Sequence, residues 1–344
     1  MKDDVLSTSK GYSSSGGGRL RAFAAGSLMV IGYTYVVLLI VAAGLLWWGG
    51  DRWWLSTVLL FGPRWILGLP LLVLFPGALW LAPRVGVALA VGLLVFLFPF
   101  LGMNVGIPRT SGPGDLEIVT INVADGRNLL ESIPEFVAGS GADIVALQEC
   151  PRAVRGSNPT IDGYEFHAHR GLCLFSRLAI RDVATDIDHD SVPGTVARYT
   201  LEHPSGDQIS FTNLHLPTPR AGLEDIREGD LRTGIEHLDR DIRLRTRAAE
   251  TARALVDGAQ APRIVVGDFN APPESRIQRD AWGDLGNAFT IAGAGFGFTR
   301  YNGWIRARID HVLFDPQWTA VSARVGEDVG SDHRPVVVRL RPKD

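Results

Sequence analysis

Three long apolar stretches dominate the N-terminal part of the chain. The first runs from Ala22 to Gly50 without a charged residue, the second from Arg64 to Leu81, and the third from Val85 to about Leu101. Because about 20 apolar residues are needed to cross the hydrocarbon core of a bilayer, each stretch is a candidate transmembrane helix. The pattern therefore predicts three spans, at about 25–48, 64–81 and 85–101, in an anchor that covers residues 22–104.

Neither a cleaved signal peptide nor a buried hairpin fits these stretches as well. A signal peptide would have an apolar region of only about 7 to 15 residues and a small-residue cleavage site, and three apolar segments in succession argue against a buried hairpin in a soluble protein. An arginine at mid-bilayer costs roughly 2.5 to 3.5 kcal/mol, so the second span should begin at Arg64 rather than contain it. Trp53 to Gly62 is then too short to cross, and we expect an amphipathic or interfacial segment there.

The charges that flank the spans predict an orientation. Residues 1–21 are polar and rich in Ser and Gly, which is typical of a disordered tail. With the N-terminus in the cytoplasm, the basic residues on the cytoplasmic side would be Lys2, Lys10, Arg19, Arg21 and Arg84, against Arg52 and Arg64 on the other side. The positive-inside rule favours this arrangement. We therefore expect a multi-pass protein of the plasma or inner membrane with a cytoplasmic N-terminus and an extracytoplasmic region after residue 104.

The pattern changes after a Gly- and Pro-rich linker at residues 105–115. Short β-branched runs then alternate with helical patterns, and the longest helix is expected at about Ile235–Val256. The predicted strands are Leu116–Asn122, Asp143–Leu147, Gln208–Leu214, Arg263–Val266, Ile309–Phe314 and Pro335–Leu340. This alternation predicts an α/β domain over residues 116–344.

Charge and cysteine content narrow the functions that this domain can have. Residues 1–104 carry seven Lys or Arg and three Asp or Glu, so the rest carries 34 − 7 = 27 against 37 − 3 = 34, a net charge of −7. An acidic domain disfavours a generic nucleic-acid surface, which neutralises phosphates with clustered basic residues. Cys150 and Cys173 fit no zinc-site spacing and can form at most one disulfide, and the spacing leaves open whether they pair.

Polar residues recur just after the predicted strands, where α/β folds place ligands and catalytic groups. In chain order they are Asn122, Glu149, His215, Asp268, Asn270, Asp310, Asp332 and His333. This set offers carboxylates and imidazoles rather than thiolates. Hard cations such as Mg²⁺ bind carboxylate and carbonyl oxygens and complete their coordination with water and substrate phosphate.

The segments around these residues resemble the endonuclease/exonuclease/phosphatase superfamily. The matching motifs, in the order of the family, are INV, LQE, NLHL, GDFN, RIDHVL and SDHRP. The resemblance covers residues 116 to 341. It implies a four-layer α/β/β/α sandwich, with the active site at one end of two packed sheets, and a metal-dependent phosphoester hydrolase with Mg²⁺, or alternatively Mn²⁺, as cofactor.

The resemblance also implies which residues hold the metal. Glu149 would be the main Mg²⁺ ligand, helped by Asn122, and Asp332 would be a further ligand or a carboxylate that supports one. Some members of the superfamily carry an Asp two residues after the Asn, where this chain has Ala124. Asp125 could replace it, although it is one residue out of register and could equally cap the following helix.

Further roles follow from the resemblance for the catalytic residues. Asp268 would orient or deprotonate the attacking water, and Asn270 would hold the water and a phosphate oxygen. Asp310 would pair with His333 and fix its tautomer. His215 would donate to a non-bridging phosphate oxygen. Phosphoryl transfer needs positioning and charge neutralisation more than covalent chemistry, which agrees with this set.

For several further polar residues we expect a structural role. His167 and His169 share one face of an expected strand, so a second metal pair is the minor alternative there. His311 should point to the opposite sheet face from Asp310, by strand alternation. We expect Cys173 and Ser176 to be structural rather than nucleophilic, and the arginines from Arg220 to Arg247 to form a solvated helix face rather than a phosphate funnel.

The substrate is predicted from context, because the fold and the motifs fix the reaction and not the leaving group. An acidic domain tethered to the outer membrane face should meet lipid-linked phosphates more readily than duplex DNA. Three spans before such a domain also resemble the membrane phosphatases associated with glycopeptide resistance, which implies an undecaprenyl-pyrophosphate-like or other lipid phosphate. The alternatives are an anchored extracytoplasmic nuclease and, third, a non-catalytic receptor on the same fold. Oligomeric state is not predicted.

Overall fold

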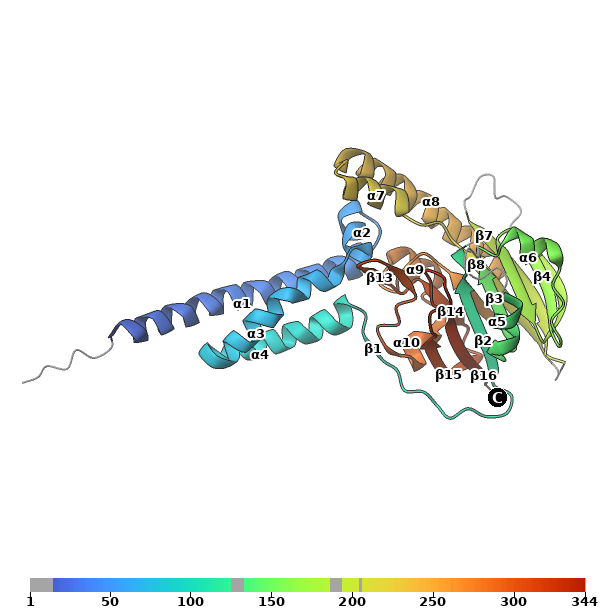
Figure 1. Cartoon of the computed structure of the whole chain (residues 1–344), viewed down its shortest axis with the longest axis horizontal. Coiled ribbons are helices and arrows are strands. Elements are labelled where there is room, and N and C mark those ends of the chain that lie inside the picture. The colour runs from blue at the N-terminus through green and yellow to red at the C-terminus, as the bar shows by residue number, and fades with distance from the viewer. Residues whose placement is uncertain (1–14, 125–132, 186–193, 204–205, 261, 344) are drawn as a thin grey trace, which may run out of the picture. The chain divides into compact units, whose positions relative to one another are not determined.

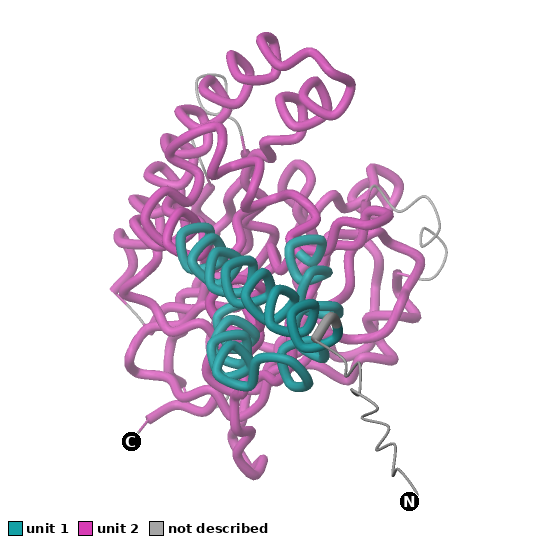
Figure 2. The backbone as a smooth tube through the Cα atoms, turned by 90° about the vertical axis from the view of Figure 1, so that its left-hand side faces the viewer, with its two compact units in different colours: residues 1–42, 65–96 teal, residues 43–64, 97–344 magenta. Residues whose placement is uncertain are grey.

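The computed structural model describes residues 15–124, 133–185, 194–203, 206–260 and 262–343. The chain divides into two compact units, and Figure 2 shows them in different colours. One unit comprises residues 1–42 and 65–96, and the other comprises residues 43–64 and 97–344. Of the predicted segments, residues 1–14 of the tail lie outside the described residues.

The first unit is formed by apolar helices. It contains most of α1 (Ser15–Gly49), the end of η1 (Arg64–Gly68), α3 (Leu69–Leu81) and α4 (Pro83–Val95), which is followed by η2 (Phe96–Phe100). Three helical segments, 17–49, 64–81 and 83–100, are long and apolar enough to cross a membrane. Large apolar side chains such as Val73 and Trp80, each 76% exposed, point away from the unit, as expected of lipid-facing positions.

The second unit begins with the end of α1 and the short helix α2 (Trp54–Phe61), which lies in the segment predicted to be interfacial. Ser56, Thr57 and Leu60 of α2 are buried, and α2 packs on α8 (Leu231–Asp257). Residues 43–64, which run from the end of the first candidate span to the start of the second, are called the interspan segment below.

Two six-stranded mixed sheets form the centre of the second unit (Figure 1). The first has the order β15 (Trp318–Val325), β16 (Val336–Pro342), β2 (Leu116–Asn122), β3 (Ile144–Gln148), β5 (Leu172–Ser176) and β4 (Glu165–His169). The second has the order β10 (Gly286–Asn287), β14 (Asp310–Phe314), β9 (Arg263–Asp268), β8 (Gln208–His215), β7 (Thr195–Glu202) and β6 (Ala179–Thr185). The central pairs β2–β3 and β8–β9 are parallel.

Helices and small hairpins complete the unit. The helices are α5 (Ile133–Ser140), α6 (Arg152–Ser157), α7 (Arg220–Glu228), α8, α9 (Arg276–Trp282) and α10 (Ala288–Ala292). The short strand pairs are β1 (Asn104–Val105) with β11 (Ala294–Gly295), and β12 (Arg300–Asn302) with β13 (Ile305–Ala307).

Strand alternation sorts the apolar side chains into three cores and so produces the layers. On β2, Ile118 points to the core between the two sheets, whereas Val119 and Ile121 point to the core under α5 and α6. On β9, Val266 points to the core between the sheets and Val265 to the core under α8 and α9. The order is therefore helices, sheet, sheet, helices, which confirms the four-layer α/β/β/α sandwich expected from the sequence.

Most of the predicted strands form within a residue or two of their expected bounds, and α8 contains the predicted helix. The strand expected around His167 and His169 forms as β4, whereas the sequence did not predict β6, β7 and β15, whose patterns are less regular. The burial of β6, for example, alternates poorly, with two adjacent exposed residues, Arg181 and Asp182. Such strands take their conformation from neighbours in the sheet rather than from a strong local signal.

Gly267 of β9 gives a test of the packing beside the site. Its φ is +134°, and a Cβ atom at this position would lie 2.0 Å from the carbonyl oxygen of Leu214 in β8. We expect Gly267→Ala to lower the free energy of unfolding by at least about 2 kcal/mol, because strain and a backbone clash add. Gly114→Ala, with φ +83° and no neighbouring atom within 4 Å, should carry the strain alone. Thermal unfolding of both full-length variants in detergent measures the difference, and equal midpoints would contradict the packing at Gly267.

Candidate active site

The strand registers bring the polar residues at the strand ends together. In the first sheet, Asn122 at the end of β2 pairs with the residue directly before Glu149. In the second sheet, His215 pairs with Asp268 across β8 and β9, and Asp268 pairs with Asp310 across β9 and β14. The carboxyl ends of both parallel pairs therefore meet at one end of the sandwich.

Asp268 lies where the two sheets meet, and its side chain is fully buried. Its Oδ2 accepts a hydrogen bond from Asn122 Nδ2 at 3.0 Å, and its Oδ1 accepts one from the backbone N–H of Asn270 at 2.8 Å. His215 Nε2 and His333 Nε2 lie 3.7 and 3.8 Å from Oδ2. A carboxylate of the second sheet is thus bonded directly to an amide of the first.

The surroundings of Asp268 change its acidity. Burial raises the pKa of this carboxyl, and the nearby Asp310 carboxylate raises it further, against the opposing effects of His333, His215 and the Asn122 hydrogen bond. A carboxylate with a raised pKa is a stronger base than an exposed aspartate. Asp268 is therefore suited to accept a proton from a water molecule.

Asp310 and His333 form a buried pair. His333 Nδ1 donates to Asp310 Oδ2 at 2.8 Å, and neither side chain is exposed. Burial opposes a charge on His333, but the carboxylates of Asp310 and Asp268 outweigh it and raise the pKa of the imidazole to about 9. Burial also opposes a charge on Asp310, and His333 reverses this effect, so the pKa of Asp310 is lowered. The pair fixes the ring with Nε2 toward Asp268.

The donor atoms at this point suit a hard divalent cation. Asp268, Asp310 and His333 each present a ligand atom, and these three atoms lie within 4.8 Å of one another. Asp310 Oδ1 is buried and has no hydrogen-bond partner among the described residues. Glu149, 40% exposed, accepts from Asn122 Nδ2 at 3.0 Å through Oε1. Carboxylate oxygens without thiolates fit Mg²⁺ or Mn²⁺.

The backbone at Glu149 is held in an unusual conformation. Its φ is +49°, in the left-handed region that non-glycine residues seldom adopt. The next residue, Cys150, forms a disulfide with Cys173 of β5, which answers the pairing left open by the sequence. Its backbone N–H also donates to the carbonyl of Gly171 at 2.8 Å. These two attachments hold Glu149 at the mouth of the site against the strain.

Asn270 is held on three sides. It too has a positive φ, +48°, which asparagine tolerates better than most residues. The side-chain Nδ2 of Asn270 donates to the carbonyl of Leu216 at 2.7 Å. Arg245 Nη2 donates to the backbone carbonyl of Asn270 at 2.9 Å. One amide hydrogen bond is made in this way, so the second N–H and the side-chain oxygen can contact water or phosphate.

Arg300 is a site residue that the sequence did not predict. It lies on β12, and its Nη2 is 2.9 Å from Asp332, which the sequence had indicated as a metal ligand or supporting carboxylate. Its Nη1 is 2.9 Å from His333 Nε2, a contact that is a hydrogen bond only while Nε2 is unprotonated, and the charge of Arg300 opposes the raised pKa of His333. Arg300 therefore competes with a proton for this nitrogen. Asp332 is 41% exposed and 3.9 Å from His333, so it stands at the rim.

The structure also places the residues for which a structural role was expected. His167 Nδ1 lies 3.4 Å from the Tyr199 hydroxyl, and burial lowers the pKa of His167. His311 Nε2 bonds to the carbonyl of Ala271, and burial lowers the pKa of His311 to about 4. The hydroxyl of Ser176 bonds within its own turn, to Leu178. Asp125, the alternative ligand after Asn122, lies outside the described residues.

The arginines of α7 and α8 mostly pair with acids on the same helix. Arg220 bonds to Glu224 at 2.6 Å and Arg232 to Glu236 at 3.2 Å, each at the i,i+4 spacing. Arg245 points inward and is 3% exposed. These contacts fit a solvated, paired helix face better than a funnel for nucleic-acid phosphates.

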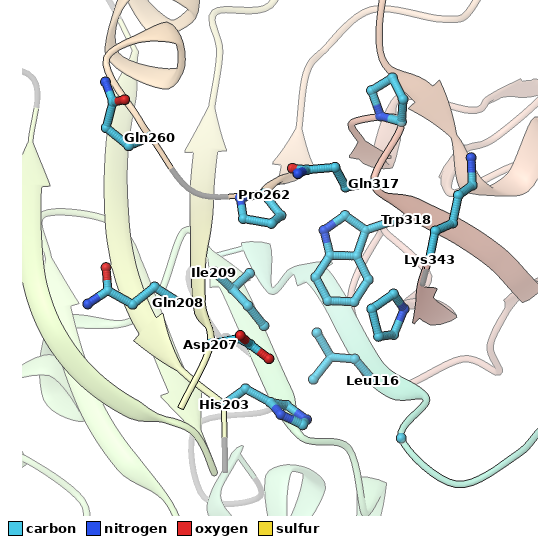
Figure 3. Close-up of a pocket in the computed structure, with 13 residues that line it drawn as sticks. Leu116, His203, Asp207, Gln208, Ile209, Gln260, Pro262, Gln317, Trp318 and Lys343 are labelled. Carbon is cyan, nitrogen blue, oxygen red and sulfur yellow. The ribbon is translucent and has the colours of Figure 1, made fainter. Parts of the chain in front are cut away.

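A separate cavity of about 1080 Å³ opens at the other end of the sandwich (Figure 3). Leu116 at the start of β2, Gln208 at the start of β8 and Trp318 of β15 line it, and its lining contains none of the predicted site residues. Cavity size does not locate the chemistry here.

Comparisons with known proteins identify the family and agree with the fold. The model of the Endonuclease/Exonuclease/phosphatase family matches residues 119–333, and no curated protein sequence matches the chain. A crystal structure of humanised D. rerio TDP2 is 16% identical, with a TM-score of 0.50 over 66% of this chain and 99% of that one. Bacteroides thetaiotaomicron mannosyl-6-phosphatase is 19% identical, with a TM-score of 0.49 over 65% and 99%. At these identities the likeness is one of fold alone.

The Asp310–His333 pair predicts a titration. The pair stabilises the protonated imidazole, so its contribution to stability is complete below pH 6.5 and is lost as pH rises through about 9. In the metal-free chain, Asp310→Asn should lower the pKa of His333 by more than one unit, because burial then opposes the charge with less compensation. NMR titration of the histidine ring measures this. Asp332→Asn, which removes an exposed carboxylate, should change the pKa little, and equal effects of the two variants would contradict the assignment.

Proposed function

Because the chain belongs to the endonuclease/exonuclease/phosphatase family, we propose that it is a metal-dependent phosphoester hydrolase acting at the site around Asp268. The observation that carries this proposal is the convergence of side chains from both sheets within a few ångströms. Asn122 bonds to Glu149 and Asp268, while His215 and His333 approach the same Asp268 oxygen. A phosphate bound there would meet a base, cation ligands and hydrogen-bond donors together.

Each group then has a role in hydrolysis. Asp268, with its raised pKa, accepts the proton of the attacking water, and Asn270 holds that water and a phosphate oxygen. Glu149 and Asn122 would hold Mg²⁺ or Mn²⁺, with Asp332 as an additional carboxylate at the rim. Asp268, Asp310 and His333, although their ligand atoms lie within 4.8 Å of one another, then act on the water and the phosphate instead. The cation, when bound, neutralises charge on the phosphate oxygens.

Three further side chains would neutralise the remaining negative charge on the phosphate oxygens. His215, 28% exposed, can donate to a non-bridging oxygen. His333 is protonated at neutral pH because of Asp310. Its Nε2–H can donate a hydrogen bond to a bound phosphate oxygen, which then replaces the contact with Arg300. The guanidinium of Arg300 is then available to the same phosphate.

Replacement of the proposed base tests the reaction. Asp268→Asn should lower kcat for bis-p-nitrophenyl phosphate by about 10²- to 10⁴-fold, the range for a lost general base. The assay uses the full-length chain in detergent with Mg²⁺. Asp182→Asn, an exposed carboxylate on β6, is the matched control and should retain wild-type activity. Full turnover by Asp268→Asn would refute the assignment, and a wild-type chain inactive on every phosphoester would favour a receptor.

The proposed substrate is a lipid-linked phosphate. The candidate spans support a membrane location, and a cavity of about 120 Å³ beside the site supports an amphiphilic substrate. Its polar side includes Asn270, Arg220 and Arg300. Its apolar lining comprises Phe61 of the interspan segment, Leu223, Ile305, Ala307 and Ile309. A hydrocarbon chain attached to a phosphate at Asn270 could enter this lining.

The proposed orientation places this site outside the cytoplasm. The basic residues before the first span favour a cytoplasmic N-terminus, and three crossings would then carry the C-terminal part to the other side. The Cys150–Cys173 disulfide supports the same arrangement, because structural disulfides persist in oxidising compartments. A reporter enzyme fused after residue 344 and active only outside the cytoplasm is the direct check.

A polar substitution in the apolar lining tests the substrate class. Leu223→Asn should raise KM for a polyprenyl pyrophosphate in detergent by about 10-fold, since Leu223 is half-buried in the free chain and covering a leucine fully contributes about 1.5–3 kcal/mol. KM for bis-p-nitrophenyl phosphate should stay unchanged. Leu231→Asn, at a position 51% exposed and outside the cavity, is the control. Plasmid DNA nicked as fast as the lipid is hydrolysed would contradict the lipid proposal and favour a nuclease.

A further inference from the structure

Two buried charges mark the interspan segment. Asp51, two residues after the end of α1, is 0% exposed, and Arg64, at the start of the second candidate span, is 7% exposed. Charged side chains are seldom buried unless they are paired. Both therefore need partners, and both find them in the second unit, outside the segment itself.

Asp51 is bonded by the loop and helix that follow β9. Ser275 Oγ donates to its Oδ2 at 2.7 Å, and the backbone N–H groups of Arg276 and Ile277 donate to its Oδ1 at 2.8 and 3.1 Å. Arg245 Nη1 of α8 lies 3.0 Å from Oδ2, a charge contact rather than an aligned hydrogen bond. Four groups from two separate elements thus converge on one carboxylate.

Arg245 connects this carboxylate to the catalytic loop. Its other terminal nitrogen, Nη2, donates to the carbonyl of Asn270 at 2.9 Å, and its guanidinium lies 5.3 Å from the ring centroid of Phe61 in α2. Asn270 in turn bonds Asp268 and Leu216. One guanidinium therefore touches the interspan segment at two points and a proposed catalytic residue at a third.

The far end of the segment repeats this arrangement. Arg64 Nη1 donates to the carbonyl of Phe100 at 2.7 Å and lies 3.5 Å from Glu274 Oε2. Glu274 is 3% exposed and belongs to the same loop as Asn270. The loop from 270 to 277 is thus clamped by a negative charge from one end of the interspan segment and a positive charge from the other.

From these contacts we propose that the interspan segment supports the active site through one residue, Asp51, which acts through Arg245 to position Asn270. The proposal rests on the role proposed above for Asn270. Asp51 and Arg245 are positioning residues and touch neither water nor phosphate. Breaking a buried ion pair leaves its partner charged and uncompensated, so Arg245 without Asp51 would leave its place or draw in water. The carbonyl of Asn270, at a strained φ, would lose its support.

The test compares three variants of the full-length chain in detergent. Asp51→Asn keeps the shape and an acceptor for the backbone N–H groups but removes the charge that faces Arg245. It should lower kcat for bis-p-nitrophenyl phosphate by about 10-fold with KM nearly unchanged, because small misplacements of a reacting group are costly. Arg52→Gln is the matched control, since Arg52 is 59% exposed and pairs with the exposed Asp280. It should leave kcat at the wild-type value.

Non-additivity, measured with Asn270→Ala as the third variant, separates positioning from general destabilisation. If Asp51 acts through Asn270, then Asp51→Asn should have no further effect on kcat in a chain that already carries Asn270→Ala. A full additional 10-fold loss in that background would overturn the proposal, as would an unchanged kcat for Asp51→Asn alone.

A second measurement does not depend on activity. Hydrogen exchange at the Asn270 amide, which bonds to Asp268, should be several-fold faster in Asp51→Asn than in the wild type or Arg52→Gln. Equal exchange in all three would overturn the proposal. Should the wild-type chain hydrolyse no phosphoester, the proposed function fails and exchange alone decides whether Asp51 positions this loop.

Discussion

The buried carboxylate of Asp268 is the interaction on which the rest of the structure depends. A carboxylate removed from water is stable only where hydrogen bonds and opposite charges replace its hydration. One of these groups, the Asn122 amide, comes from the other sheet, so the two sheets must meet at this end. The same requirement brings two imidazoles to one oxygen, and these are the donors proposed above for a bound phosphate.

Compensation of this charge continues outward from the site. Asp268 accepts a hydrogen bond from the N–H of Asn270, and the carbonyl of Asn270 accepts one from Arg245. The charge of Arg245 is in turn paired with that of Asp51. Each step satisfies one buried polar group by placing another beside it. The series ends only in the interspan segment, where the chain is about to enter or leave a candidate span. The local chemistry of the site therefore extends to a segment that connects two candidate spans.

The sequence was sufficient for the strands that carry the site and insufficient for the contacts that support it. β2 and β9 are short, strongly apolar and followed at once by Asn122 and Asp268, so their period and ends could be recognised locally. Arg300 follows no apolar run, and Asp51 and Arg245 lie 194 residues apart in the numbering. Such pairs form through the tertiary fold, and a single sequence records neither their register nor their burial.

The two connections between the candidate spans and the catalytic domain are both held by contacts with that domain. Residues 105–115 have the composition of a flexible tether, yet Gly106 bonds to Gly293 and Arg109 to Val321. On the other side, Asp51 lies only two residues after α1 ends, and a residue spans at most about 3.6 Å of extended chain. If α1 lies in a membrane, as proposed, so short a connection keeps the catalytic domain near the membrane surface. Such a domain would meet its substrate at the membrane surface. This supports the proposal of a lipid-linked phosphate, because a hydrocarbon chain keeps that phosphate at the bilayer.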